Sequence, residues 1–178
     1  DHSAAVADTV KYLYGKGRRR IGIALLDSDS IFTNMREHGY KDGISAVGLD
    51  IRPELLFRMK EKFEEIGDYG AGRVFRNLVK AGRADAVNCV NDQMAMNFMR
   101  VLADEGYGVP GDVAVVGHGN SIYCQWGTPP LSSIYADPGE LAEAACRLVD
   151  LMLETPDREA LKEQFVTVVP KLELRESC

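Results

Sequence analysis

The stretch "AVNCVNDQMAMNFMRVLADEGYGVPGDVAVVGHGN", residues 86–120, specifies a strand, a helix and a second strand. An apolar run ends at Val90, and the run "VAVVGHGN" (113–120) breaks at a glycine, so each is expected to form a buried strand. Between them, a helix carries its apolar side chains on one face, namely Ala95, Phe98, Met99 and Leu102. Two strands joined through a helix of this length lie parallel, with the helix covering one face of the sheet.

Strand and helix patterns alternate in the same way along the rest of the chain. Helices are expected at 4–16, from Thr33 or Asn34 to Gly48, at about 69–80 and at 139–153. Strands are expected at 20–26, in "ELLFRM" (54–59) and in "EQFVTVVPKLELR" (163–175), where Pro170 indicates an edge; a charged loop follows "ELLFRM". The pattern predicts an α/β fold, a three-layer parallel sheet with helices on both faces.

Size and charge limit the classes of function. The 178 residues, of which 46% are hydrophobic, suffice for one domain with a sizeable core. The 21 Lys and Arg against 27 Asp and Glu give a net charge of -6, which argues against a nucleic-acid backbone as the main ligand of these residues. The only basic run, Arg18 to Arg20, is interpreted as a solvated edge that leads into a strand.

The cysteines and the termini bear on the compartment. The four cysteines include no CxxC pair, and Cys89 and Cys146 are expected to be buried thiols in a reducing compartment, the cytoplasm. No segment has the length of a membrane span, and no signal segment opens the sequence. Because Asp1 has no methionine before it and leads directly into a helix pattern, we expect the sequence to be part of a longer protein.

Asn91 and Asp92 stand where a buried strand becomes a helix. In an open parallel sheet, ligands bind beyond the carboxyl ends of the strands. We expect Asp92 to be the helix cap, because a carboxylate accepts hydrogen bonds from the first amides of a helix, and Asn91 to remain available for a ligand. The alternative is that both residues only end the strand and cap the helix.

Two other strand ends carry polar residues that should lie at the same edge. Asp27 to Ser30 follow one strand and precede Arg36, whereas His118 and Asn120 follow another. An arginine near the start of a helix opposes the helix dipole, which favours a role in binding hydroxyls or a carboxylate. The alternative for Arg36 is an ordinary exposed arginine.

No catalytic constellation is recognisable in the sequence. The chain lacks the GxSxG, Walker, HExxH and complete GxGxxG motifs, so we expect neither an enzyme nor a bound metal or cofactor. A histidine at a strand end is more often a hydrogen-bonded structural residue than a base. If the protein were an enzyme, His118 with Asp27 would be the pair to consider.

Five segments together resemble one family: "YLYGKGRRRIGIALL", "NMREHGYKDGISAVGLD", residues 86–120, "PPLSSI" and "VPKLELRES". They are similar to the effector-binding domain of the LacI/GalR family of bacterial transcription regulators. The resemblance implies a periplasmic-binding-protein-like (type I) fold, with two α/β subdomains around a small-molecule cleft and a separate helix-turn-helix head that binds operator DNA.

The resemblance also implies how the chain is divided. Residues 1–178 would be a single truncated effector-binding domain, in which 1–134 and 160–178 form the C-terminal subdomain. Residues 135–159 would normally pack on an N-terminal subdomain that this sequence lacks. Without that cover, the apolar stripe of this segment favours self-association, so a homodimer, or an exchange of this helix between chains, is expected.

The family's effector residues are carried over by position. Arg36 matches the arginine that grips the effector, Asn91 matches the strand-end asparagine, and Ser30 and Phe32 stand in the loop that touches the ligand. The remaining candidates are His118 and Asn120, since Gly119 replaces the family's usual aspartate and leaves a standard hexose or purine in doubt. The implied partners are a sugar or related metabolite, a second copy and operator DNA through the absent head, but no membrane. The alternative is an extracytoplasmic sugar-binding protein of a transporter.

Overall fold

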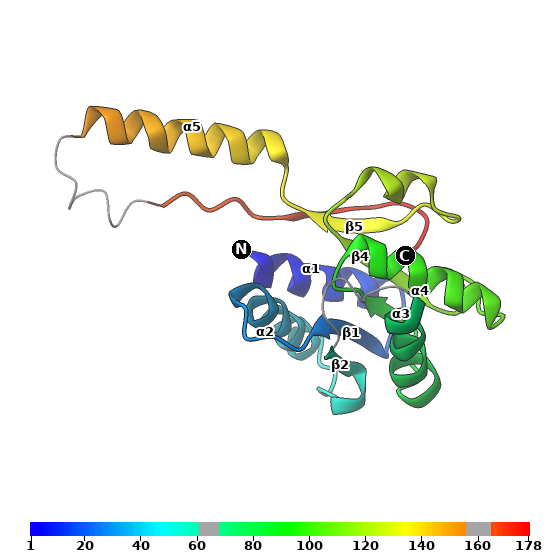
Figure 1. Cartoon of the computed structure of the whole chain (residues 1–178). Coiled ribbons are helices and arrows are strands. Elements are labelled where there is room, and N and C mark those ends of the chain that lie inside the picture. Colours follow the sequence, from blue (N-terminus) through cyan, green and yellow to red (C-terminus); the bar gives the residue numbers. More distant parts are fainter. Residues whose placement is uncertain (61–67, 156–164) are drawn as a thin grey trace.

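The computed structural model describes residues 1–60, 68–155 and 165–178, which form an α/β body and one helix that extends away from it (Figure 1). The body contains a six-stranded sheet in the order β2-β1-β3-β4-β5-β6. Its strands are β1 (Ile21–Leu26), β2 (Leu56–Met59), β3 (Ala86–Asn88), β4 (Ala114–His118), β5 (Ser132–Tyr135) and β6 (Lys171–Glu173).

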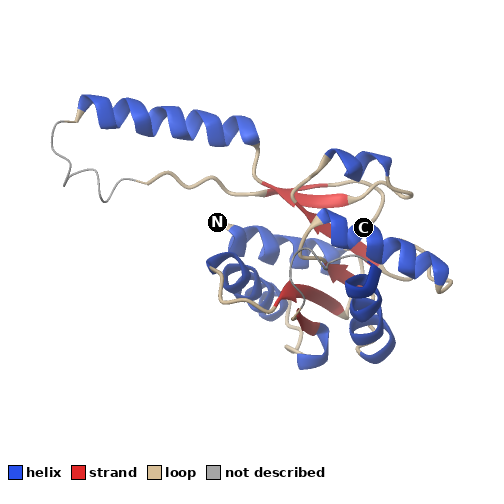
Figure 2. Ribbon diagram, viewed as in Figure 1, coloured by secondary structure: helices blue, strands red, loops and turns tan. Residues whose placement is uncertain are grey.

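The α-helices are α1 (His2–Gly15), α2 (Ile31–Ala46), α3 (Asp68–Val74), α4 (Asp92–Asp104) and α5 (Pro138–Glu154). The other helices are the 3-10 helices η1 (Pro53–Leu55) and η4 (Ile122–Trp126), and η3 (Phe75–Ala81), which continues α3 as a π-helix. The helices predicted from the apolar periodicity are therefore present (Figure 2). The charged loop expected after "ELLFRM" falls mostly at 61–67, outside the described residues, as do the first two residues of "EQFVTVVPKLELR".

The sheet lies between two helical layers, as predicted. Helices α1 and α2 share a hydrophobic core with one face of the sheet through Ile21, Ile23 and Val116, among others. On the opposite face, α3, η3 and α4 share a second core with Ala24 and Val115. Successive residues of a strand point to opposite faces, so β1 and β4 contribute to both cores.

The predicted parallel sheet is confirmed, with one antiparallel strand at its edge. Strands β2, β1, β3, β4 and β5 pair in parallel, but β6 runs antiparallel to β5, with Ile134 opposite Leu172. After β5 the chain leaves the sheet through α5 and returns in the opposite direction, so β6 can only pair antiparallel. The predicted position of this strand at an edge is confirmed.

Helix packing brings the first residues of α1 close to α2. A Cβ atom on Gly39 would lie 2.1 Å from the carbonyl oxygen of Ser3, so only glycine permits this approach of the two backbones. The hydroxyl of Ser3 also donates a hydrogen bond to the carbonyl oxygen of Met35 at 2.9 Å. The start of α1 is thus held over the first turns of α2.

The basic run before β1 contacts neighbouring loops. The guanidinium of Arg18 donates to the carbonyl oxygen of Gly111 at 3.2 Å, and that of Arg20 lies 4.0 Å from the carboxylate of Asp85. Arg19 and Arg20 are exposed. The interpretation of this run as a solvated edge leading into a strand is confirmed.

Helix α5 extends away from the body (Figure 1). Ala144 is its only buried residue, whereas its apolar side chains are largely exposed, namely Leu141, Val149, Leu151, Met152 and Leu153. Cys146 is exposed as well, which corrects the expectation that it is buried; Cys89 is buried as predicted. In this chain, the apolar stripe of α5 has no cover among the described residues.

Candidate functional site

The carboxyl ends of β1, β3 and β4 lie side by side. These three strands are adjacent and parallel, so the loops that follow them meet at one edge of the sheet. The loops carry Ser30, Asn91 and Asn120, and Arg36 follows in α2. The topology therefore confirms that the strand ends chosen from the sequence share a single edge.

The expectation that Asp92 caps the helix is wrong. The N-cap of α4 is Asn91, whose side-chain oxygen accepts a hydrogen bond from the amide of Met94 at 2.8 Å. Asp92 is the first residue of the helix and is buried. Its carboxylate accepts hydrogen bonds from the amide of Ser121, at 2.6 Å, and from the hydroxyl of Ser133. Asp92 therefore connects α4 to the loop before η4 and to β5 through buried hydrogen bonds.

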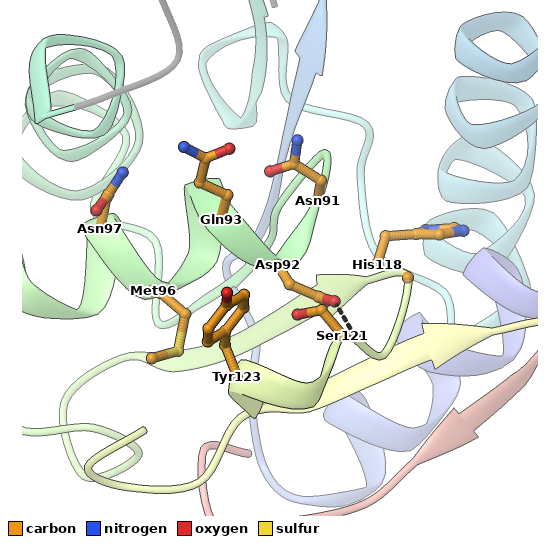
Figure 3. A pocket seen from close by; sticks show the side chains of 9 residues that line it. Asn91, Asp92, Gln93, Met96, Asn97, His118, Ser121 and Tyr123 are labelled. Carbon is orange, nitrogen blue, oxygen red and sulfur yellow. Dashed lines mark hydrogen bonds between the residues drawn. The ribbon is translucent and has the colours of Figure 1, made fainter. Parts of the chain in front are cut away.

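A cavity of about 720 Å³ opens beside the start of α4 (Figure 3). It is lined by Asn91, Asp92, Gln93, Met96, Asn97, His118, Gly119, Ser121 and Tyr123. Most of the polar groups are neutral amides and hydroxyls, which suit a small polar ligand. Of the residues proposed from the sequence, Asn91 and His118 line this cavity. Gln93 and Asn97 were missed, although their spacing of four puts them on the helix face opposite the core.

His118 forms a pair with a residue that sequence reasoning missed. Its Nε2 atom lies 3.1 Å from Nδ1 of His2, and its ring is directed away from the cavity toward α1 and α2 (Figure 3). Burial and the nearby Arg36 guanidinium lower the pKa of His118 to about 3, and the same two causes lower the pKa of His2. Both rings are therefore neutral near pH 7. No local signal marks His2, because 116 positions separate it from its partner.

Arg36 belongs to α2, and its side chain extends to the loop that follows β3. Its Nη1 atom donates to the carbonyl oxygen of Val90 at 3.0 Å, immediately before Asn91. Its Nε atom is buried and has no hydrogen-bond partner among the described residues. Burial lowers the pKa of Arg36. The alternative of an ordinary exposed arginine is wrong, since the side chain is partly buried.

Ser30 and Phe32 lie at the start of α2. Ser30 is the N-cap, accepting from the amide of Thr33 at 3.2 Å, so the expected cap at Thr33 or Asn34 is corrected. Phe32 is 55% exposed and meets the ring of His2 edge to face, with the ring centres 5.3 Å apart. Phe32 therefore stands beside the histidine pair, and neither residue lines the cavity.

The backbone after β4 has a conformation that favours glycine at position 119. Gly119 has φ +126, a conformation that side chains with L configuration rarely adopt, and a Cβ there would lie 3.3 Å from Oδ2 of Asp92. Asn120 has φ 53, and its amide oxygen accepts from Nη2 of Arg175 at 2.7 Å. The side chain of Asn120 is therefore bound toward the C-terminal segment, and it does not line the cavity.

The pair considered for an enzyme does not form. Asp27 lies 3.8 Å from the guanidinium of Arg58, whereas His118 is bonded to His2. Within residues 1–60, 68–155 and 165–178, no cluster of three or more metal-ligating side chains occurs. Among the same residues, no helix combines the length and apolar character that crossing a bilayer requires.

The cavity lies beside the carboxyl ends of β3 and β4, the place where open α/β sheets bind small molecules. Residues 10–178 match the model of the periplasmic binding protein-like domain, and the chain belongs to this family. The relationship to LacI-type regulators expected from the sequence is confirmed by the relatives.

One curated relative is the HTH-type transcriptional repressor PurR of Mannheimia succiniciproducens. It is 28% identical over 167 residues, which cover 94% of this chain and 48% of the relative. The chain thus spans about half the length of the curated relatives it matches.

Two solved structures share the fold. A regulatory protein of the LacI family from Chloroflexus aggregans is 28% identical with a TM-score of 0.84, covering 99% of this chain and 61% of that chain. The complex of the transcriptional regulator CelR with cellobiose is 28% identical with a TM-score of 0.81, covering 100% of this chain and 52% of that chain.

Proposed function

We propose that this chain is the effector-sensing part of a bacterial DNA-binding transcriptional regulator, a repressor, that binds a small molecule at its strand-end edge. The observation that carries the proposal is the cavity beside the start of α4, on a sheet edge that also presents Arg36. A sugar or related metabolite fits the neutral amides and hydroxyls of the wall, and the CelR relative was solved with cellobiose. Such relatives are regulators, so we infer no catalysis.

The effector-binding residues in this proposal are Arg36 and Asn91, with Ser30, Phe32 and His118 beside them. An effector that binds a closed cleft better than an open one shifts the equilibrium between the two conformations. Binding at the cleft then changes the affinity for DNA by the same coupling free energy, typically about 1–3 kcal/mol. The chain's net charge of -6 agrees with a DNA contact made elsewhere in the protein.

Replacing Arg36 tests the proposal directly. In the full-length protein, Arg36→Ala should abolish the response of operator binding to the effector and leave operator binding itself intact, because the arginine lies at the effector edge. DNA-binding titrations with and without effector measure both quantities. Arg19→Ala removes an exposed arginine before β1, at the other end of the strands, and should change neither. An unchanged response in Arg36→Ala would refute the assignment.

The division of the chain is also part of the proposal. Residues 1–134 and 160–178 would form one subdomain, and 135–159, which include α5, would cover a second subdomain outside this chain. The exposed apolar side chains of α5 support this division, as do relatives about twice as long. The gene sequence upstream of the codon for residue 1 tests this division and the proposed cytoplasmic location. A helix-turn-helix encoded there supports the regulator, whereas a signal peptide supports the less favoured transport protein.

We propose a homodimer as well. In the chain alone, the exposed face of α5 should associate with a second copy, because a helix with this much uncovered apolar surface tends to aggregate or pair. Light scattering at micromolar concentration measures the mass. Leu153→Lys places a charge on the exposed stripe and should reduce association, with no change in the fold of the body. A monomeric wild-type chain would contradict this part of the proposal.

A further inference from the structure

Arg36 is a partly buried cation without an acidic partner among the described residues. Its recorded hydrogen bond goes to a neutral carbonyl oxygen, that of Val90. A charge removed from water is costly unless an opposite charge or several hydrogen bonds compensate it. The buried, unpartnered Nε atom adds to this cost. Among the described residues, no acidic side chain compensates the positive charge of Arg36.

The acidic side chains nearby are each engaged elsewhere. Asp92 accepts from Ser121 and Ser133, Glu37 pairs with Lys41 and Arg58, and Asp27 lies near Arg58. Asp1 accepts from the amides of Ser3 and Ala4 at the start of α1. None of these carboxylates forms an ion pair with Arg36 in the described part of the chain.

The two histidines on which Arg36 acts electrostatically carry no charge near pH 7. His2 and His118 share a hydrogen bond, and the pKa of each is lowered by burial and by Arg36, so neither supplies charge near pH 7. At the end of β4, Gly119 provides no side chain at all. The one carboxylate in the cavity wall, that of Asp92, already accepts a hydrogen bond at each oxygen.

Arg36 is not part of the cavity wall, but it lies next to residues that line it. The carbonyl to which it donates belongs to Val90, and the next residue, Asn91, lines the cavity. His118, another lining residue, has Arg36 as the main charged influence on its pKa. Nη1 is held by Val90 and Nε is buried, so Nη2 is the donor that remains for an oxygen of a carboxylate or phosphate.

We infer that the effector is an anion, a small polar molecule whose carboxylate or phosphate compensates the charge of Arg36 while its neutral part lies beside Asn91 in the cavity. This inference rests on the proposed function, since it concerns the charge of the effector at the same site.

Matched neutral and anionic compounds test the charge of the effector. The panel contains glucose, glucuronate and glucose 6-phosphate, and ribose and ribose 5-phosphate, each titrated calorimetrically into the full-length protein. We expect binding by an anionic member at least about tenfold tighter than by its neutral counterpart. The glucuronate and phosphate arms separate a carboxylate from a phosphate.

A substitution that adds a negative charge to the cavity wall without changing the size of the side chain gives a second test. Asn91→Asp keeps the helix cap, because Asn and Asp are comparable N-caps, but it places a negative charge beside the arginine. It should weaken anion binding at least about tenfold. Asn120→Asp is the same substitution at a side chain that contacts Arg175 and not the cavity, so anion binding should not change.

The outcomes distinguish a failure of the anionic-effector inference from a failure of the proposed function. Equal binding of neutral and anionic members, binding by no anion in the panel, or undiminished anion binding in Asn91→Asp would each overturn the anionic effector. The proposed function would still stand if another small molecule bound at the edge and changed operator affinity. An anion that bound tightly with no effect on operator affinity would instead contradict the proposed function alone.

Discussion

Helices α4 and α5 have similar amphipathic sequences and very different surroundings. In α4, the buried residues are Asp92, Met94, Ala95, Phe98, Met99 and Leu102, whereas in α5 the only buried residue is Ala144. Both helices begin with a side-chain cap, from Asn91 and Asp137 respectively. An apolar stripe thus indicates that a helix has a face to bury, but it does not identify what covers that face.

The difference has an energetic consequence. Most of the stability of a helix in a protein comes from packing its apolar face, since isolated helices are marginal in water. Helix α4 is packed into the core of the body, whereas α5 depends on its own hydrogen bonds and its cap. Matched substitutions in the two helices measure how much more packing contributes to the stability of α4 than to that of α5.

The largest contrast is expected for one leucine in each helix. Leu102 is 0% exposed in α4, and Leu153 is 81% exposed in α5. Leu102→Ala should lower the free energy of unfolding by about 2–5 kcal/mol, through lost burial and the cavity left behind. Leu153→Ala should change it by less than about 0.5 kcal/mol in the chain alone. Urea unfolding followed by circular dichroism measures both.

The result expected for Leu153→Ala differs between the chain alone and the full-length protein. If a further subdomain covers α5, Leu153→Ala should become costly in the full-length protein, because the side chain is then buried. Equal costs for Leu102→Ala and Leu153→Ala in the chain alone would show that α5 is covered there and would contradict the structure.

A smaller contrast is expected for an aspartate at the start of each helix. The buried carboxylate of Asp92 accepts from Ser121 and Ser133, so Asp92→Asn should destabilise the fold by about 1–3 kcal/mol, because an amide nitrogen would face a donor. Asp137 is an N-cap that accepts from Gly139 and Glu140, and Asp137→Asn should be nearly neutral. Thermal unfolding distinguishes the two, and a neutral Asp92→Asn would contradict the role of this carboxylate.

The smallest effect on stability is expected from lowering the pH, and it should come from His118 in the α/β body. His118 has a folded-state pKa of about 3 against an ordinary value of 6.5, because burial, Arg36 and His2 disfavour its charged form. The unfolded chain then binds a proton that the folded chain does not, so stability is complete above about pH 6.5 and falls as the pH drops toward 3.

His118→Gln isolates this effect. Between pH 7.5 and 5.5, the wild-type chain should lose up to about 1 kcal/mol more stability than the variant, since one pKa unit corresponds to about 1.4 kcal/mol. Unfolding at both pH values measures the difference. Because the pKa of His2 is lowered too, part of the slope should remain in the variant. Identical slopes in the two proteins would contradict a buried, neutral His118.

The candidate site was only partly predictable. Its location followed from the sequence, because polar residues after apolar strands meet at one edge of a parallel sheet. The roles of Asn91 and Asp92 did not follow. Either residue type caps a helix, and the choice was made by Ser121 and Ser133, whose positions along the chain are 29 and 41 residues from Asp92.

Apolar periodicity involves residues close together in the chain, so the helices, the strands, the parallel pairing of β1, β3 and β4 and the edge that carries Arg36 and Asn91 could be predicted. The pairing of His2 with His118, the contact of Asn120 with Arg175 and the antiparallel β6 became visible only in the folded chain. These features depend on side chains and segments that approach one another through folding, and no local pattern encodes which of them will meet.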